Sequence, residues 1–147
     1  QELIAFVEEQ ARNKTLLIVG HEPSDLMAIC DRMIAMKAGK VVQDSTVDEM
    51  YHYPKNEYVA RLSGLCNVLS EAAQDVLNTG EAYVRPSHLV VEAGEEWQLE
   101  RIYFYGYGRM GSFRSRQMGE LLDVQLGNSF SYQRGLSYGL SIKKPQR

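Results

Sequence analysis

The chain has 147 residues, of which 44% are hydrophobic and 24% charged, and its formal net charge is −3. These proportions exclude a disordered or fibrous chain, and the length suffices for one domain or two small ones. Residues 1–65 carry seven basic and ten acidic side chains and residues 66–147 carry nine of each, so neither half has the positive excess of a nucleic-acid binder.

Hydropathy and cysteine spacing indicate a cytosolic protein without a metal site. Apolar runs such as residues 16–19 are far shorter than the roughly 20 residues that a membrane-spanning helix needs, and no signal peptide is recognisable. Cys30 and Cys66 lack the Cys/His spacing of a zinc site, so we expect two buried thiols and no bound metal.

The chain begins with a helix, a strand and a second helix. Apolar side chains at helical spacing predict a helix from Leu3 to Ala11 that is already under way at the first residue, so we expect a piece of a longer protein. The continuous apolar run 15–19 is typical of a strand covered on both faces in a parallel sheet. Pro23 suits the first turn of the next helix, which we expect to run to Asp31.

A hairpin is predicted next. Residues 33–36 and 41–42 have strand composition, and Gly39 between them supplies the positive φ of a tight turn. Lys40 does not make this turn a phosphate-binding loop, because Val41 follows it where such a loop needs Ser or Thr.

Two short helices close this part of the chain. Thr46 and Glu49 have the spacing of a capping box, which predicts a helix starting at Thr46. Pro54 separates it from a last helix near residues 56–62, and the first unit is expected to end at Gly64.

Beyond Gly64 the pattern is that of a small antiparallel β-barrel, because glycine becomes frequent and short alternating runs replace helical spacing. The candidate strands are residues 82–84, 88–91, 97–105, 109–116, 121–126 and 138–142.

Residues 15–64 resemble the end of the nucleotide-binding domain of ABC transporters. The family pattern is an apolar strand ending in His and an acidic residue, a helix closing in Asp-Arg, a strand, a Gly turn, a Gln and a capped helix. The matching positions here are His21, Glu22, Asp31, Arg32, Gly39, Gln43 and residues 46–49. Residues 53–60 are similar to the linker helix of importers that carry an extra C-terminal domain.

The second half resembles that extra domain. Residues 84–88, Val-Arg-Pro-Ser-His, are similar to the entry strand of the oligonucleotide-binding-like (OB-like) accessory barrel called TOBE. The resemblance therefore implies, for residues 1–64, the α/β tail of a P-loop ATPase core, and for residues 65–147 an all-β OB-like (TOBE) barrel. Such barrels occur in importers of iron, spermidine, sulfate, molybdate and sugars, and no residue here selects among these substrates.

The resemblance also implies a role for His21. In this family the histidine after the strand contacts the γ-phosphate of ATP and helps to position the attacking water, so His21 is the expected catalytic switch residue. The parent subunit would use ATP and Mg²⁺, form a homodimer, drive a membrane permease and lie on the inner face of the cell membrane. The 147 residues lack the phosphate-binding loop, so we expect this chain alone to have no cofactor site and no ATPase activity.

Two other functions compete with this interpretation. One is a non-catalytic barrel that senses a ligand or a protein partner. The other is single-strand nucleic-acid binding, which arginines next to aromatic rings can support. We expect no nucleic-acid partner, since alternate rings should be buried and acidic residues balance the basic ones. The interleaved residues are Arg101, Tyr103, Phe104, Tyr105, Tyr107, Arg109, Phe113, Arg114 and Arg116.

Overall fold

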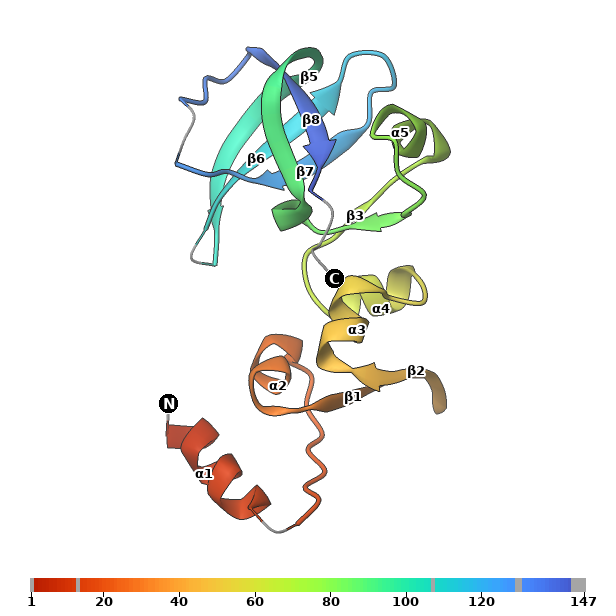
Figure 1. The fold of residues 1–147 in the computed structure, drawn as a ribbon, viewed down its shortest axis with the longest axis vertical. Helices are drawn as coiled ribbons and strands as arrows, with labels where there is room; N and C mark the ends of the chain where they lie inside the picture. Colours follow the sequence, from red (N-terminus) through yellow and green to blue (C-terminus); the bar gives the residue numbers. More distant parts are fainter. Residues whose placement is uncertain (1, 13, 107, 129–130, 144–147) are drawn as a thin grey trace. The chain divides into compact units, whose positions relative to one another are not determined.

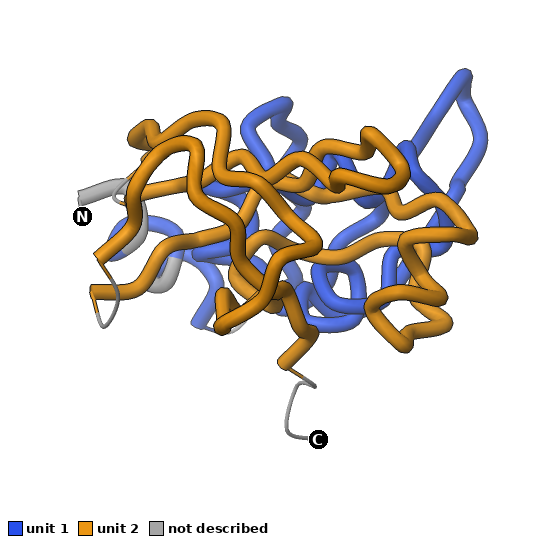
Figure 2. The backbone as a smooth tube through the Cα atoms, turned by 90° about the horizontal axis from the view of Figure 1, so that it is seen from above, with its two compact units in different colours: residues 1–64 blue, residues 65–147 orange. Residues whose placement is uncertain are grey.

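The structure is a computed structural model that describes residues 2–12, 14–106, 108–128 and 131–143. Tyr107, named above, lies outside these residues, and the side chain of Leu3 is likewise not described. The chain divides into two compact units, residues 1–64 (unit 1) and residues 65–147 (unit 2), coloured separately in Figure 2. Figure 1 shows mostly helices in unit 1 and mostly sheet in unit 2.

Unit 1 contains short helices and one β-hairpin. Its elements are α1 (Glu2–Ala11), α2 (Pro23–Ile29), β1 (Arg32–Lys37), β2 (Lys40–Thr46), α3 (Val47–His52) and α4 (Glu57–Leu62). The four predicted helices and the predicted hairpin are confirmed.

The turn between β1 and β2 has the geometry that its sequence predicts. Lys37 pairs with Lys40, so Ala38 and Gly39 alone form the turn. Their φ angles are +49° and +75°, and positive φ at both central residues is what matches the twist of a two-stranded hairpin. The predicted role of Gly39 is confirmed, and Lys40 follows a hairpin turn.

The starts of α3 and α4 are fixed by side-chain caps. The Thr46 hydroxyl accepts a hydrogen bond from the Glu49 amide at 3.2 Å, and the Glu49 carboxylate accepts one from the Thr46 amide at 3.2 Å. Asn56 Oδ1 accepts from the Val59 amide at 3.1 Å. Each bond satisfies an amide that the first helical turn leaves without a partner, so the predicted capping box is confirmed.

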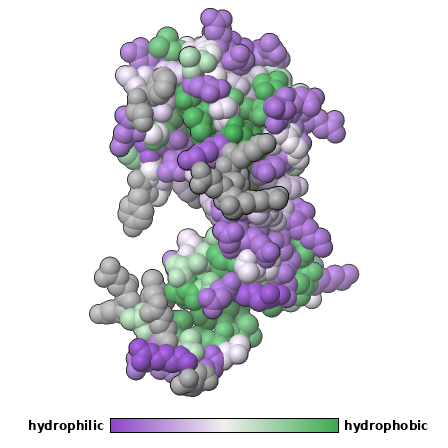
Figure 3. All heavy atoms as spheres, viewed as in Figure 1, coloured by the Kyte–Doolittle hydropathy of each residue, from purple (hydrophilic) through white to green (hydrophobic). Residues whose placement is uncertain are grey.

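The core of unit 1 is small. Among the described residues its buried apolar cluster consists of Ala35, Met50 and Val59. Many large apolar side chains are exposed instead, and Figure 3 shows apolar surface on this unit. They include Leu16, Leu17, Val19, Ile34, Met36, Val41 and Tyr53.

The predicted parallel strand at residues 15–19 is wrong for this structure. Residues 15–20 form no regular element, and Leu17 and Val19 are 83% and 91% exposed. A strand requires a neighbour to accept and donate its backbone hydrogen bonds, and none of the sheets pairs with this segment. The described part of unit 1 therefore contains an antiparallel hairpin and no parallel sheet.

Unit 2 consists of a two-stranded ribbon and a four-stranded antiparallel sheet. Its elements are β3 (Asn67–Val68), α5 (Glu71–Val76), β4 (Tyr83–Val84), the 3₁₀ turn η1 (Pro86–His88), β5 (Leu89–Tyr105), β6 (Gly108–Ser115), β7 (Leu121–Gln125) and β8 (Ser137–Ile142). β3 pairs with β4, and the larger sheet has the order β7-β6-β5-β8.

β5 joins two strands that the sequence predicts separately. Its register against β8 shifts between Glu92 and Trp97, and this irregularity bends the strand, which pairs with β8 from Leu89 to Gln98 and with β6 from Trp97 to Tyr105. At Gly94 the backbone of β5 lies very close to the backbone of β8: a Cβ placed there would come 2.6 Å from the Cα of Gly139. Glycine at both positions permits this close approach.

The bend curls the sheet around one core. Trp97, Leu99 and Phe113 are almost completely buried in it, and Tyr138 contacts the Phe113 ring edge-on at 5.8 Å between centroids. The sheet is a curled half-barrel: β7 and β8 are its two outer strands and do not pair with each other. A mostly β, barrel-like unit is thus confirmed, and the sheet of the described residues closes only half of a barrel.

Two further features differ from the expectations or were not foreseen. Helix α5 is capped by Ser70, whose hydroxyl accepts from the Ala73 amide at 3.2 Å, and was not predicted. Neither Cys30 nor Cys66 forms a disulfide bond within the described residues, and both are only half-buried, so the prediction of buried thiols is wrong in degree. No helix within the described ranges is long and apolar enough to cross a membrane.

Candidate functional site

His21, the predicted catalytic residue, lies on an exposed loop directly before α2. Its side chain is 95% exposed, and its Nε2 lies 3.8 Å from Oε1 of the adjacent Glu22. An exposed imidazole of this kind can reach a ligand, but a catalytic site also requires donors fixed around the reacting group. The 147 residues contain no phosphate-binding loop that would supply them. The switch role of His21 remains a prediction.

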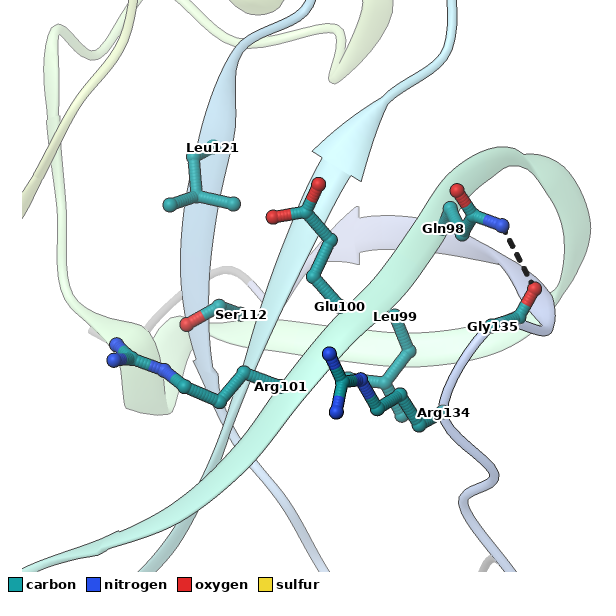
Figure 4. A pocket seen from close by; sticks show the side chains of 8 residues that line it. All are labelled: Gln98, Leu99, Glu100, Arg101, Ser112, Leu121, Arg134 and Gly135. Carbon is teal, nitrogen blue, oxygen red and sulfur yellow. Dashed lines mark hydrogen bonds between the residues drawn. The ribbon is translucent and has the colours of Figure 1, made fainter.

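A pocket of about 690 Å³ opens on unit 2. Figure 4 shows the residues that line it: residues 98–101 of β5, Ser112 of β6, Leu121 of β7, and residues 134–135 of the segment before β8. That segment is tied to β5 by three hydrogen bonds, including one of 2.9 Å from Gln98 Nε2 to the carbonyl oxygen of Gly135. The pocket thus lies on a sheet surface whose strands hold its walls in place.

The strand register explains why polar side chains meet in this pocket. Leu99 pairs with Phe113, and both are buried in the core. The register then shifts, so that Arg101 pairs with Ser112. Ser112 in turn pairs with Asp123 of β7. Because paired residues point to the same face and neighbours alternate, these three polar side chains form a row on the face away from the core.

An ion pair neutralises the acidic residue of the pocket. The Arg114 guanidinium binds both carboxylate oxygens of Glu100, with 3.1 Å between Nη2 and Oε2, and its Nη1 donates to the Gly119 carbonyl at 2.8 Å. These contacts lower the pKa of Glu100 and raise the pKa of Arg114, and the nearby charge of Arg134 lowers the Glu100 pKa further. Glu100 is therefore ionised and already paired.

The two arginines that line the pocket have no ion-pair partner in the part of the chain that the structure describes. The Arg101 guanidinium lies over the Tyr103 ring, 4.5 Å from its centroid, a contact that orients it without cancelling its charge. Arg134 comes from the segment before β8. The lining therefore presents two cationic groups.

Tyr103 and Ser112 are held by Asp123 at the edge of this pocket. The Ser112 hydroxyl donates to Asp123 Oδ1 at 2.6 Å. Partial burial and the Asp123 carboxylate raise the pKa of Tyr103 to about 12, so its phenol stays protonated near neutral pH. Asp123 thus has bonded neighbours, and Tyr103 supplies a neutral, fixed surface for Arg101.

The chemistry of the pocket suits binding rather than catalysis. Its lining residues include no histidine, lysine or cysteine, and the group that accepts the Ser112 hydrogen bond is the Asp123 carboxylate, a weaker base than the histidine or lysine that usually activates a serine. Within the described ranges no three His, Cys, Asp or Glu side chains are grouped so that they could hold a metal ion. Guanidinium groups and a neighbouring side-chain amide are donors, and donors of this kind bind anions.

Comparison with known proteins identifies the relatives of the chain. No family model matches it. The chain is 46% identical over 54 residues to the spermidine/putrescine import ATP-binding protein PotA of Haemophilus ducreyi, a match covering 37% of this chain and 15% of that protein. The chain is related to the ATP-binding subunits of ABC importers. The resemblance to importer ATP-binding subunits is confirmed, and the resemblance of the second half to a TOBE barrel stays a prediction.

Two further relatives are named for other substrates. The chain is 38% identical over 55 residues to the Fe(3+) ions import ATP-binding protein FbpC of Streptomyces avermitilis, covering 37% of this chain and 16% of that protein. It is 36% identical over 56 residues to the glycine betaine/carnitine/choline transport ATP-binding protein OpuCA of Bacillus subtilis, covering 38% and 15%. The matched part spans about 15% of the length of these relatives, and their differing substrates select none for this chain.

Sequence reasoning missed the pocket, although it noted some of its residues. Arg101 was part of the series of interleaved arginines and aromatic residues. Some rings of that series are buried and others are exposed: Phe113 is buried, whereas Phe104 and Tyr105 are 80% and 57% exposed. Arg134 belongs to a separate segment, and only the pairing of β5 with residues near β8 brings it close. The available signal was the absence of any Asp or Glu between residues 101 and 119.

Proposed function

We propose that this chain is the C-terminal region of the ATP-binding, energy-coupling subunit of a bacterial ABC importer. Residues 1–64 would be the end of the nucleotide-binding domain, which is the α/β tail of a P-loop ATPase core, and residues 65–147 the TOBE-type, OB-like accessory barrel. The observation that carries the proposal is the identity of up to 46% with importer ATP-binding subunits.

The surface of unit 1 supports its assignment to a larger core. Leu17 and Val19 are exposed on a segment without strand partners, and Ile34 and Met36 are each 52% exposed on the hairpin. Exposed apolar surface of this extent is usual where another part of a protein packs. The central strands of an ATPase sheet would pair with residues 15–19 and cover these side chains.

In the full-length parent, His21 would act as the switch histidine. A residue that follows a strand of an open α/β sheet lies at the edge where such sheets bind ligands, and its imidazole can donate to the γ-phosphate. ATP and Mg²⁺ would bind through residues of the parent protein that lie outside this chain of 147 residues. A homodimer of these subunits would drive a transmembrane permease from the cytoplasmic face of the membrane.

Unit 2 would serve regulation or dimer contact. Its curled half-barrel and its cationic pocket also support a second candidate function, a ligand-sensing module without a catalytic role. The two candidates differ in what precedes unit 1, since only the first requires nucleotide-binding motifs in the same protein.

The coding sequence upstream of residue 1 decides between them. We expect, in the same reading frame, a Gly-x4-Gly-Lys-Ser/Thr loop followed by a Leu-Ser-Gly-Gly-Gln signature, and Mg²⁺-dependent ATP hydrolysis by the encoded protein. A stop codon in frame, or an upstream domain without these motifs, would reject the importer subunit and leave the sensing module.

A further inference from the structure

Three arginines at the pocket on unit 2, Arg101, Arg114 and Arg134, outnumber its two carboxylates, Glu100 and Asp123, by one positive charge. Residues 101–119 include four arginines and no Asp or Glu. Of the two acidic side chains beside the pocket, Glu100 is bound by Arg114 and Asp123 accepts the Ser112 hydroxyl. Arg101 and Arg134 form no ion pair with any described residue. Two guanidinium groups on one pocket attract an anion from solution.

Arg101 is oriented before any ligand arrives, and the backbone next to Arg134 is tied to β5. Arg101 is stacked on the Tyr103 ring, and Tyr103 is kept neutral beside Asp123. Arg134 precedes Gly135, whose amide donates to the Leu99 carbonyl at 2.8 Å and whose carbonyl accepts from Gln98. Figure 4 shows the two arginines reaching the pocket from β5 and from the segment before β8. Binding to donors already ordered loses less conformational entropy.

The size and lining of the pocket favour an organic ligand over an inorganic ion. Its volume of about 690 Å³ lies within the range of roughly 300–1,000 Å³ that is typical of small-molecule sites. Leu121, 44% exposed, adds an apolar surface next to the polar row. An anion with a short carbon skeleton would contact both, whereas a lone oxyanion would leave most of the volume to water.

We propose that this pocket binds a small organic anion whose carboxylate or phosphate groups contact Arg101 and Arg134. Both groups accept the parallel hydrogen bonds that a guanidinium donates. The second N–H of Gln98 Nε2 offers a further donor, and Leu121 packs against the carbon skeleton. The site lies within unit 2 alone, so it does not depend on the ATPase assignment of unit 1.

Calorimetric titration of the 147-residue chain with succinate and, separately, with glycerol 3-phosphate tests this site. We expect at least one of them to bind saturably at one site per chain, and the one that binds tells whether the site prefers carboxylate or phosphate. Arg101→Gln and Arg134→Gln should each weaken that binding by about tenfold or more, because each removes a charged hydrogen-bond donor. Arg114→Gln should also weaken it, since it releases the charge of Glu100 into the pocket.

Arg116→Gln is the matched control, because Arg116 is an exposed arginine just after β6 that does not line the pocket. It should bind the probe like the unaltered chain, and the fluorescence of Trp97 should show that every variant is folded. The proposal would be overturned if neither probe bound saturably. It would also be overturned if the Arg101→Gln and Arg134→Gln variants bound the probe as tightly as the unaltered chain. Sulfate binding with the same affinity as the organic anion would overturn it as well, because it would indicate an unselective cationic surface.

Discussion

The side-chain amide of Asn67 binds the backbone of Asp123 in both directions. Its Nδ2 donates to the Asp123 carbonyl at 2.7 Å, and its Oδ1 accepts from the Asp123 amide at 2.8 Å. Asn67 is buried, and these bonds link the ribbon β3–β4 to the outer strand β7 of the sheet. They also occupy backbone groups of β7 that would otherwise be open to a further strand.

Asn67→Ala should lower the free energy of unfolding of unit 2 by about 2 kcal/mol, because two part-buried backbone groups of Asp123 lose their partner. Urea unfolding followed by the fluorescence of Trp97, the single tryptophan, measures this unit specifically. Asn128→Ala, at an exposed position, is the control and should change the free energy by less than about 0.5 kcal/mol. Equal effects of the two substitutions would show that the Asn67 bonds do not stabilise the unit.

Gly94→Ala should destabilise unit 2 by about 1–3 kcal/mol, because the added Cβ would lie 2.6 Å from backbone atoms of Gly139 and force β5 away from β8. Gly80→Ala is the matched control, since a Cβ there meets nothing within 4 Å. Urea unfolding monitored through Trp97 compares the two. If Gly94→Ala were as stable as the unaltered chain, the close approach of the β5 and β8 backbones at Gly94 would be contradicted.

Tyr103 should make unit 2 less stable in strong alkali. Its folded-state pKa of about 12 exceeds the value near 10 expected for an unfolded chain, so the folded state disfavours the phenolate. The stabilisation is therefore complete below pH 10 and is lost as the pH rises from 10 towards 12. Tyr103→Phe should flatten the dependence of unfolding free energy on pH in this window.

Absorbance titration at 295 nm gives a second measure of the same group. Tyr103→Phe should remove one phenol from the step near pH 12, whereas Tyr105→Phe, the control, should leave that step in place. If Tyr103→Phe instead removed one phenol from the absorbance step near pH 10, the result would contradict the contact of Tyr103 with Asp123.

The sequence predicts best those features that depend on neighbouring residues. Thr46 and Glu49 form their capping box within a single helical turn, and Gly39 adopts its positive φ within a two-residue turn. Neither requires a distant partner. The run 15–19 has strand composition, yet it forms no strand because strand formation needs a hydrogen-bonded neighbour from elsewhere in the chain.

The pocket could not be predicted because it depends on register and on contacts between distant segments. The shift between Leu99 and Arg101 decides which side chains of β5 leave the core, and alternation alone does not locate such a shift. Arg134 meets the pocket only because the Leu99 backbone binds Gly135 and Leu136. Likewise, β5 appeared as two strands because its bend at residues 93–96 interrupts the alternating pattern.

The 147-residue chain should show no measurable Mg²⁺-dependent ATP turnover. It contains no Gly-x4-Gly-Lys-Ser/Thr loop, so no cradle of backbone amides surrounds the phosphates, and His21 has no bound γ-phosphate to contact. A coupled assay of phosphate release by the purified chain measures this, with buffer alone as the baseline. Turnover that requires Mg²⁺ would mean that the nucleotide site has been assigned to the wrong part of the protein.

ATP hydrolysis by the full-length subunit carrying His21→Ala tests the assignment of this chain most directly. The imidazole would contribute one positioned contact to the transition state, so its loss should lower the rate by about a hundredfold or more while the protein stays folded. Lys40→Ala, at the exposed hairpin turn, is the control and should hydrolyse ATP at the parental rate. A His21→Ala variant with the parental rate would contradict the switch role and the alignment of residues 15–64 with the nucleotide-binding domain.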